Sequence, residues 1–180
     1  MKASPLAALF ILAAGCSPPS PPAAPAAPPP AAKTEPRTAA MAHLSYKTPP
    51  EWISEEVSDA MRKAQYRIPG KGGKGAAATL TFFSMAPQSV ETIVDYWKNK
   101  MGGADASVSK IEGTAAPTTL VDIAGEYTDG QTALADARFL GAIIETGDRT
   151  WYLKFVGPSA TVSAWKDAYV EMLKGVRPIE

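Results

Sequence analysis

Residues 137–145 read Ala-Arg-Phe-Leu-Gly-Ala-Ile-Ile-Glu, and this run is apolar on both faces of a strand. Successive side chains of a strand point to opposite faces, so Phe139 and Ile143 share one of them. Leu140 and Ile144 share the other. A short run that is apolar on both faces is typical of a strand in the interior of a sheet. The sequence therefore predicts a central strand over 137–145.

The neighbouring strands are predicted from the alternation of apolar and polar side chains. Two alternating segments flank a loop of Gly and Lys residues at 70–75, which indicates a hairpin. Another hairpin joins the central strand to the next one through the turn Thr146-Gly147-Asp148-Arg149. Besides the central strand, we expect strands at 64–68, 78–84, 107–111, 119–127 and 150–156.

A first amphipathic helix is predicted between Val90 and Met101. Its apolar side chains recur at helical spacing and form one continuous stripe. Ser89 is a candidate N-cap residue, because its hydroxyl can accept a hydrogen bond from the first turn. Gly102 and Gly103 follow and are expected to end the helix.

A second amphipathic helix is predicted over about 160–174, with Gly175 and Pro178 beyond its end. Ser159 or Thr161 is expected to cap its start. Its buried stripe is expected to contain Val162, Trp165, Tyr169, Met172 and Leu173. Two helices and strands joined by hairpins predict an α+β domain with a mainly antiparallel sheet packed by two amphipathic helices.

The chain is long enough for one ordinary domain, at 180 residues. Residues 1–15 have a basic start, a short apolar run and small residues, as in a secretory signal peptide. Residues 16–40 are rich in Pro and Ala, so we expect a disordered linker that favours extended conformations. Residues 41–180 have the composition of a single globular domain.

Cys16 is the only cysteine and follows the run Leu12-Ala13-Ala14-Gly15. This ending resembles the lipobox of bacterial lipoproteins, although Ala13 stands where that family most often has Leu. The resemblance implies cleavage before Cys16, lipidation of Cys16 and anchoring to a membrane through its acyl chains. Ser17 rather than Asp after the cysteine implies an exported protein on the outer membrane that faces the periplasm. The alternative is an ordinary cleaved signal peptide.

Several motifs of the folded part occur together in one known group of proteins. They are Leu44-Ser45-Tyr46, Thr48-Pro49-Pro50-Glu51-Trp52, Met61-Arg62-Lys63-Ala64-Gln65-Tyr66-Arg67-Ile68-Pro69, Tyr96-Trp97 and Trp151-Tyr152-Leu153-Lys154-Phe155-Val156-Gly157-Pro158. With these motifs the folded part resembles a group of largely uncharacterised bacterial exported proteins with the PsbP-like α/β/α sandwich. The resemblance covers most of 44–174 and implies a fold, with no catalytic residues.

Charge and residue inventory exclude several classes of function. The chain has 18 Lys+Arg and 18 Asp+Glu, so no basic excess indicates a nucleic-acid partner. One histidine, His43, and a cysteine assigned to lipid leave no usual zinc or copper ligand set and no Ser or Cys triad. We therefore expect no metal, no cofactor and no catalytic residue in the domain.

Two motifs superficially suggest chemistry. The loop Gly70-Lys71-Gly72-Gly73-Lys74-Gly75 matches the dinucleotide fingerprint literally, but it leads into a strand instead of a helix. Asp122 and Glu126 share one face of a predicted strand. At ~3.3 Å per residue they lie about 13 Å apart, too far for a glycosidase pair, so we expect a solvated sheet face.

The sequence leaves three hypotheses for function. The first is a non-enzymatic module that binds an envelope protein partner or assists assembly. The second is a small-molecule or envelope-polymer binder with a cleft near Trp52 and the loop at 70–75, because Trp52 is the tryptophan expected to be partly exposed. The third is a hydrolytic enzyme. A concave pocket with convergent polar groups would favour the second, and an exposed apolar patch the first.

Overall fold

The computed structural model describes residues 37–179, apart from Ala42, Ser58 and Gln131. The predicted signal peptide at 1–15, the lipidation of Cys16 and most of the predicted linker lie outside the described residues. Among the described residues, no helix is long and apolar enough to cross a membrane.

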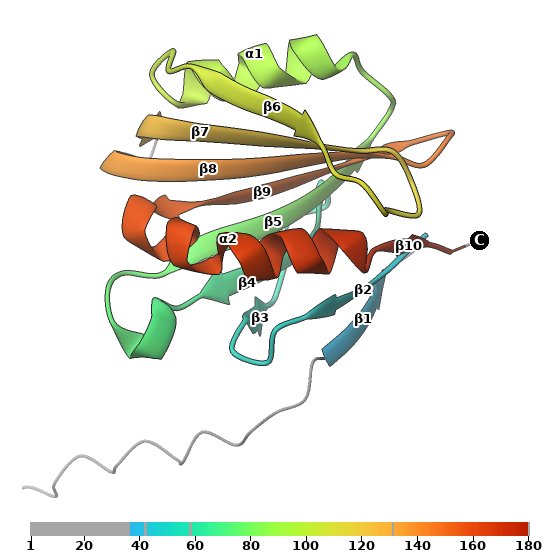
Figure 1. The fold of residues 1–180 in the computed structure, drawn as a ribbon, viewed down its shortest axis with the longest axis horizontal. Helices are drawn as coiled ribbons and strands as arrows, with labels where there is room; N and C mark the ends of the chain where they lie inside the picture. The colour runs from blue at the N-terminus through green and yellow to red at the C-terminus, as the bar shows by residue number, and fades with distance from the viewer. Residues whose placement is uncertain (1–36, 42, 58, 131, 180) are drawn as a thin grey trace, which may run out of the picture. The chain divides into compact units, whose positions relative to one another are not determined.

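A seven-stranded sheet forms the middle of the domain, and every pair of neighbouring strands in it is antiparallel (Figure 1). The predicted central strand is confirmed, because β8 lies in the interior between β9 and β7. The predicted hairpin around the loop at 70–75 is confirmed by the pairing of β4 with β5. In spatial order the strands are β3 (Ile53–Glu55), β4 (Arg62–Ile68), β5 (Ala78–Met85), β9 (Thr150–Pro158), β8 (Ala133–Glu145), β7 (Thr118–Thr128) and β6 (Ala106–Lys110).

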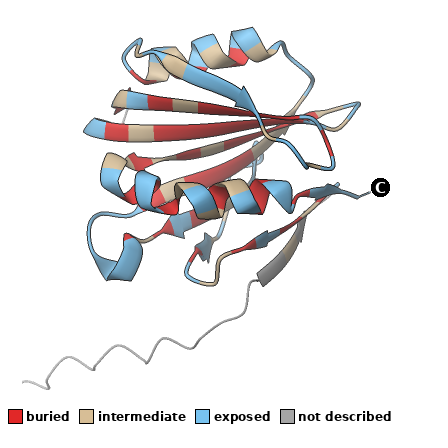
Figure 2. Cartoon of the chain, viewed as in Figure 1, coloured by how far each residue is buried: buried red, intermediate tan, exposed pale blue. Residues whose placement is uncertain are grey.

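The two helices, α1 (Val90–Lys100) and α2 (Ser159–Lys174), pack on opposite faces of this sheet. Phe139 and Ile143 belong to the buried cluster beneath α1. Leu140 and Ile144 belong to the cluster beneath α2. Buried positions accordingly concentrate on the strands, while the outer sides of both helices are exposed (Figure 2). The domain is the predicted α+β fold, with a helix layer on each side of an antiparallel sheet.

The two helices begin in different ways. The Ser89 hydroxyl accepts a hydrogen bond from the Thr92 amide at 3.2 Å, which confirms the predicted cap of α1. The predicted cap of α2 is wrong. Its N-cap residue is Pro158, and no side chain caps it. The Thr161 hydroxyl instead donates to the carbonyl of Ala76 at 2.8 Å, so it fastens the helix to the chain that enters β5.

A second, three-stranded sheet was not predicted from the sequence. It consists of β1 (Arg37–Met41), β2 (Leu44–Thr48) and β10 (Arg177–Pro178), with β2 in the middle. Leu44 and Tyr46 of β2 join the buried cluster beneath α2. The predicted linker at 16–40 is therefore too long at its carboxyl end, because strand pairing begins at Arg37 rather than at residue 41.

Candidate functional site

Helix α1 covers only part of its face of the sheet. Gly141 determines which part, because it leaves room for a side chain of the helix. The Trp97 ring lies directly over Gly141 of β8, where an added Cβ would come within 2.2 Å of it. Gly141 pairs with Val121 on one side and with Lys154 on the other. The helix is seated toward β7 and β8 as a result.

The same cross-strand row continues from Gly141 toward the other edge and becomes polar. Lys154 pairs with Thr81, and Thr81 pairs with Gln65. Gln65 in turn pairs with Glu55 of β3, and its amide donates to the Glu55 carboxylate at 2.8 Å. One face of the sheet thus changes from an apolar seat for a helix to a row of hydrogen-bonding groups.

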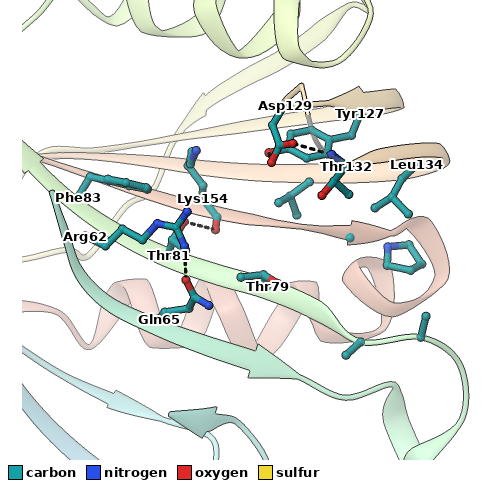
Figure 3. A pocket seen from close by; sticks show the side chains of 15 residues that line it. Arg62, Gln65, Thr79, Thr81, Phe83, Tyr127, Asp129, Thr132, Leu134 and Lys154 are labelled. Atoms are coloured by element: carbon teal, nitrogen blue, oxygen red, sulfur yellow. Dashed lines mark hydrogen bonds between the residues drawn. The ribbon is translucent and has the colours of Figure 1, made fainter. Parts of the chain in front are cut away.

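A cavity of about 400 Å³ lies over this polar half, and we call it the polar pocket (Figure 3). Its volume lies within the ~300–1,000 Å³ typical of ligand pockets. Figure 3 shows Arg62, Phe83 and Lys154 on one side of it, with Tyr127, Asp129 and Thr132 across from them. Its labelled lining residues are Arg62, Gln65, Thr79, Thr81, Phe83, Tyr127, Asp129, Thr132, Leu134 and Lys154.

Lys154 is the central charged group of the polar pocket. Its ammonium lies over the Phe83 ring, 4.8 Å from the centroid. Among the described residues, no carboxylate lies within ion-pair distance of this ammonium. Burial lowers the pKa of Lys154, the positive charges of Arg62 and Lys100 lower it further, and the Asp129 carboxylate opposes them. The charged form of Lys154 is held here at a cost in free energy.

Arg62 adds a second cation to the same side of the pocket. Its guanidinium donates to the Gln65 side-chain oxygen at 2.6 Å and lies 3.6 Å from the Asp59 carboxylate. These contacts use part of the donor set of the guanidinium, which has five N–H groups. The remaining donors and the Lys154 ammonium give this side of the pocket a positive character.

The opposite wall holds the Asp129 carboxylate in a turn. The Thr132 amide donates to it at 2.9 Å, and the Tyr127 hydroxyl donates at 3.4 Å. Burial and the neighbouring Asp129 charge raise the pKa of Tyr127 to about 12. Tyr127 therefore stays protonated at neutral pH.

A second cavity of about 350 Å³ adjoins the first, and we call it the apolar pocket. Phe83 and Lys154 line both cavities, so they mark the junction. The apolar pocket runs beside α1, and its other lining residues are Met61, Met85, Gln88, Thr92, Ile93, Tyr96, Trp97 and Tyr152. The two pockets together are called the Lys154 groove below.

The structure corrects the expectation for Asp122, which does not lie on a solvated face. Arg138 binds its carboxylate through two hydrogen bonds of 2.9 and 2.6 Å, and Lys166 of α2 donates at 2.9 Å. Burial alone would raise the Asp122 pKa, but the hydrogen bonds from Arg138 and Lys166 outweigh it and hold the pKa below its ordinary value. Asp122 therefore fastens α2 to the sheet. Glu126 is exposed.

The prediction that Trp52 is partly exposed beside a cleft is also wrong. Trp52 is only 1% exposed and contacts Phe155 and Trp165 in the core. Lys71 of the loop at 70–75 lies over the Trp165 ring at 5.3 Å. This loop leads into a strand, as predicted, and its cation packs against an aromatic ring of the domain itself.

The other sequence-predicted candidates contribute little to a site. His43 is exposed in the turn between β1 and β2. Across the described ranges, no group of three or more His, Cys, Asp or Glu residues is placed to hold a metal ion. The Lys154 groove was missed, although a lysine among the mainly apolar residues of β9 was the available signal.

No protein-family model matches this sequence, and no curated protein does. Similar solved structures include a Bacteroides thetaiotaomicron protein, 12% identical with a TM-score of 0.45 over 76% of this chain and 45% of that one. They also include the solution structure of cyanobacterial PsbP (CyanoP) from Synechocystis sp. PCC 6803. It is 9% identical with a TM-score of 0.49 over 76% of this chain and 87% of the other. At these identities and TM-scores, neither structure carries information on the activity or the ligand of this chain.

Proposed function

We propose that this protein is an exported lipoprotein whose domain binds a small ligand in the Lys154 groove without transforming it, and that the ligand carries an anionic group. One observation carries the proposal: a half-buried lysine that points into a cavity and has no ion-pair partner among the described residues. A concave pocket with convergent polar groups favours this hypothesis over a purely protein-binding surface.

The side chains around Lys154 suit the binding of an anion. Arg62 supplies a planar donor that can bind a carboxylate or phosphate through two hydrogen bonds. Thr79 and Thr81 line the same cavity and add hydroxyl groups. An anion placed beside Lys154 would offset the cost of holding a charged ammonium away from water, which is the differential interaction that ligand binding requires.

Binding of short anions tests this function. In two-dimensional NMR of the full chain, inorganic phosphate and acetate should shift the signals of Arg62, Thr81 and Lys154. The shifts should disappear in Lys154→Met and persist in Lys110→Met, the same change at an exposed lysine outside the groove. Shifts spread evenly over exposed lysines, or an unchanged response in Lys154→Met, would overturn the proposal.

The location forms part of the proposal and has a separate test. Acyl chains on Cys16 would hold the protein on the outer membrane facing the periplasm, because several chains give durable anchoring at ~0.8 kcal/mol per buried CH₂. In cells given a labelled fatty acid, Cys16→Ala should lose the label and leave the membrane fraction. Persistent labelling would contradict the lipobox prediction.

A second candidate function is the docking of an envelope protein partner. It is favoured by Met61 and Tyr96, which are 62% and 52% exposed beside the apolar pocket. A crosslinker placed at residue 61 in the full-length protein should then trap one partner, and Tyr96→Ala should reduce the yield. Crosslinks that are unchanged in Tyr96→Ala would exclude this surface.

A further inference from the structure

We infer that the ligand is a single-chain amphiphile, with a carboxylate or phosphate head at Lys154 and Arg62 and an apolar tail beside Met61, Tyr96 and Trp97. This inference rests on the proposed function and adds the class of ligand. It depends on the way in which the two pockets adjoin, because the polar pocket alone would suit any small anion.

The head position follows from charge. Lys154 and Arg62 lie on one side of the polar pocket, while the Asp129 carboxylate lies across from them (Figure 3). An anionic head is attracted to the first side and repelled by the other. The head is therefore placed near Lys154, which also lines the apolar pocket. A ligand held there has its next atoms at the junction of the two pockets.

The tail position follows from the lining of the apolar pocket. Aromatic, methionine and aliphatic side chains dominate it, and Met61 is largely exposed. Methionine side chains are flexible and polarisable, so they adapt to alkyl chains of varied shape. Covering Met61 and Tyr96 with a tail removes apolar surface from water at about 25 cal/mol per Å².

Tyr152 lies on the wall of the apolar pocket and carries a buried hydroxyl group. Tyr152 precedes Lys154 by two residues on β9, so both side chains lie on the α1 face. Tyr152 lines the apolar pocket and is 2% exposed, and its hydroxyl has no hydrogen-bond partner within the part of the chain that the structure describes. Buried hydroxyl groups normally have a partner, and a polar head group at the junction would supply one.

The test compares ligands that differ in one part at a time. Calorimetry on the full chain would use decanoate and decyl phosphate for the two head groups, and acetate and inorganic phosphate as heads without tails. Decanol supplies the tail without the charge. We expect the better of the two decyl anions to bind at least about ten-fold more tightly than its short counterpart and than decanol.

Variants then separate the two ends of the groove. Lys154→Met should weaken long and short anions alike. Tyr96→Ala should weaken only the decyl ligands, since Tyr96 is exposed and its removal leaves the buried core intact. Val108→Ala is the matched control, because Val108 is also an exposed apolar residue but lies on β6 outside both pockets.

The outcomes distinguish this inference from the proposed function. Equal binding of short and long anions, unaffected by Tyr96→Ala, would overturn the amphiphile and leave the anion site standing. Equal binding of decanol and decanoate, unaffected by Lys154→Met, would overturn the anion site itself. Failure of every probe to bind would overturn both. Preference between decanoate and decyl phosphate identifies the head group.

Discussion

The two faces of the central sheet use similar cations in opposite ways. On the α2 face, Arg138 and Lys166 converge on the Asp122 carboxylate at 2.6 and 2.9 Å. On the α1 face, Lys154 and Arg62 flank a cavity, and the Lys154 ammonium has an aromatic ring beneath it. The charges around Asp122 are paired with one another within the protein, and we call them the closed network. Lys154 and Arg62 face a cavity, and we call them the open group.

This difference separates stability from function. A charge that has lost part of its hydration is favourable only when a partner compensates for the loss. Asp122 has two partners within the domain, so its network holds α2 to β7 and β8. Lys154 has lost part of its hydration and has no carboxylate within ion-pair distance among the described residues, which is why we place the ligand there. Replacing residues in the two networks should therefore change different properties.

The largest effect is expected when the closed network is broken. Asp122→Ala leaves Arg138 and Lys166 without their carboxylate, so the free energy of unfolding should fall by about 2–3 kcal/mol, since all three groups are only partly buried. Urea unfolding at neutral pH measures this. Asp167→Ala, at an exposed position of the same helix, is the control and should change stability by less than about 0.5 kcal/mol. Equal losses in both variants would contradict the structural role of Asp122.

The same network predicts a dependence on pH. The Asp122 pKa is lower in the folded protein than its ordinary value of 3.8, so its stabilisation is fully present above that value. It is lost as the pH falls through the lower pKa of the folded state. The difference in unfolding free energy between the wild type and Asp122→Asn should therefore shrink below about pH 3.8. A difference that stays constant down to pH 2 would refute it.

A smaller effect of opposite sign is expected from the open group. Lys154→Met removes a charge that the fold disfavours, so the unfolding free energy at pH 7 should rise by about 0.5–2 kcal/mol while anion binding is lost. The Lys154 pKa is lowered by burial and by Arg62 and Lys100, against Asp129. The gain should thus diminish as the pH rises through that lowered pKa toward the ordinary value of 10.5. Loss of stability at pH 7 would indicate that Lys154 is structural.

The smallest effect is expected at an ion pair that is short but exposed. Lys174 donates to Glu171 at 2.7 Å, close to the distances around Asp122. Both side chains are well exposed, so Glu171→Ala should change the unfolding free energy by less than about 0.5 kcal/mol. A loss comparable with that of Asp122→Ala would mean that distance alone, and not burial, decides the strength of these pairs.

The sequence predicted most of the large sheet and both helices, because most of these elements have a regular apolar pattern; the short, exposed strand β6 is an exception. The three-stranded sheet was missed because β10 has two residues and β1 lies in a segment that resembles a linker. The N-cap of α2 was predicted wrongly because Thr161 bonds to Ala76, a contact between distant parts of the chain. Local pattern does not contain such information.

The site was harder to predict than the fold for a related reason. Trp52 follows two prolines, which suggested exposure, but Phe155 and Trp165 enclose it. The Lys154 groove depends on Gly141, whose missing side chain admits Trp97 and so sets where α1 stops covering the sheet. Position along a strand predicts which face a residue occupies, but not whether that face is covered.

The three-stranded sheet also determines how the domain would respond to mechanical load. Among the residues that the structure describes, strand β1 pairs only with β2, over five residue pairs from Arg37 to Met41. Tension on the chain ahead of Arg37 therefore acts first on this short pairing. Peeling β1 away would lengthen the chain while β2 stays paired with β10 and packed beneath α2. In a protein pulled by its amino-terminal end, β1 would separate from β2 and lengthen the chain before the Lys154 groove is disturbed.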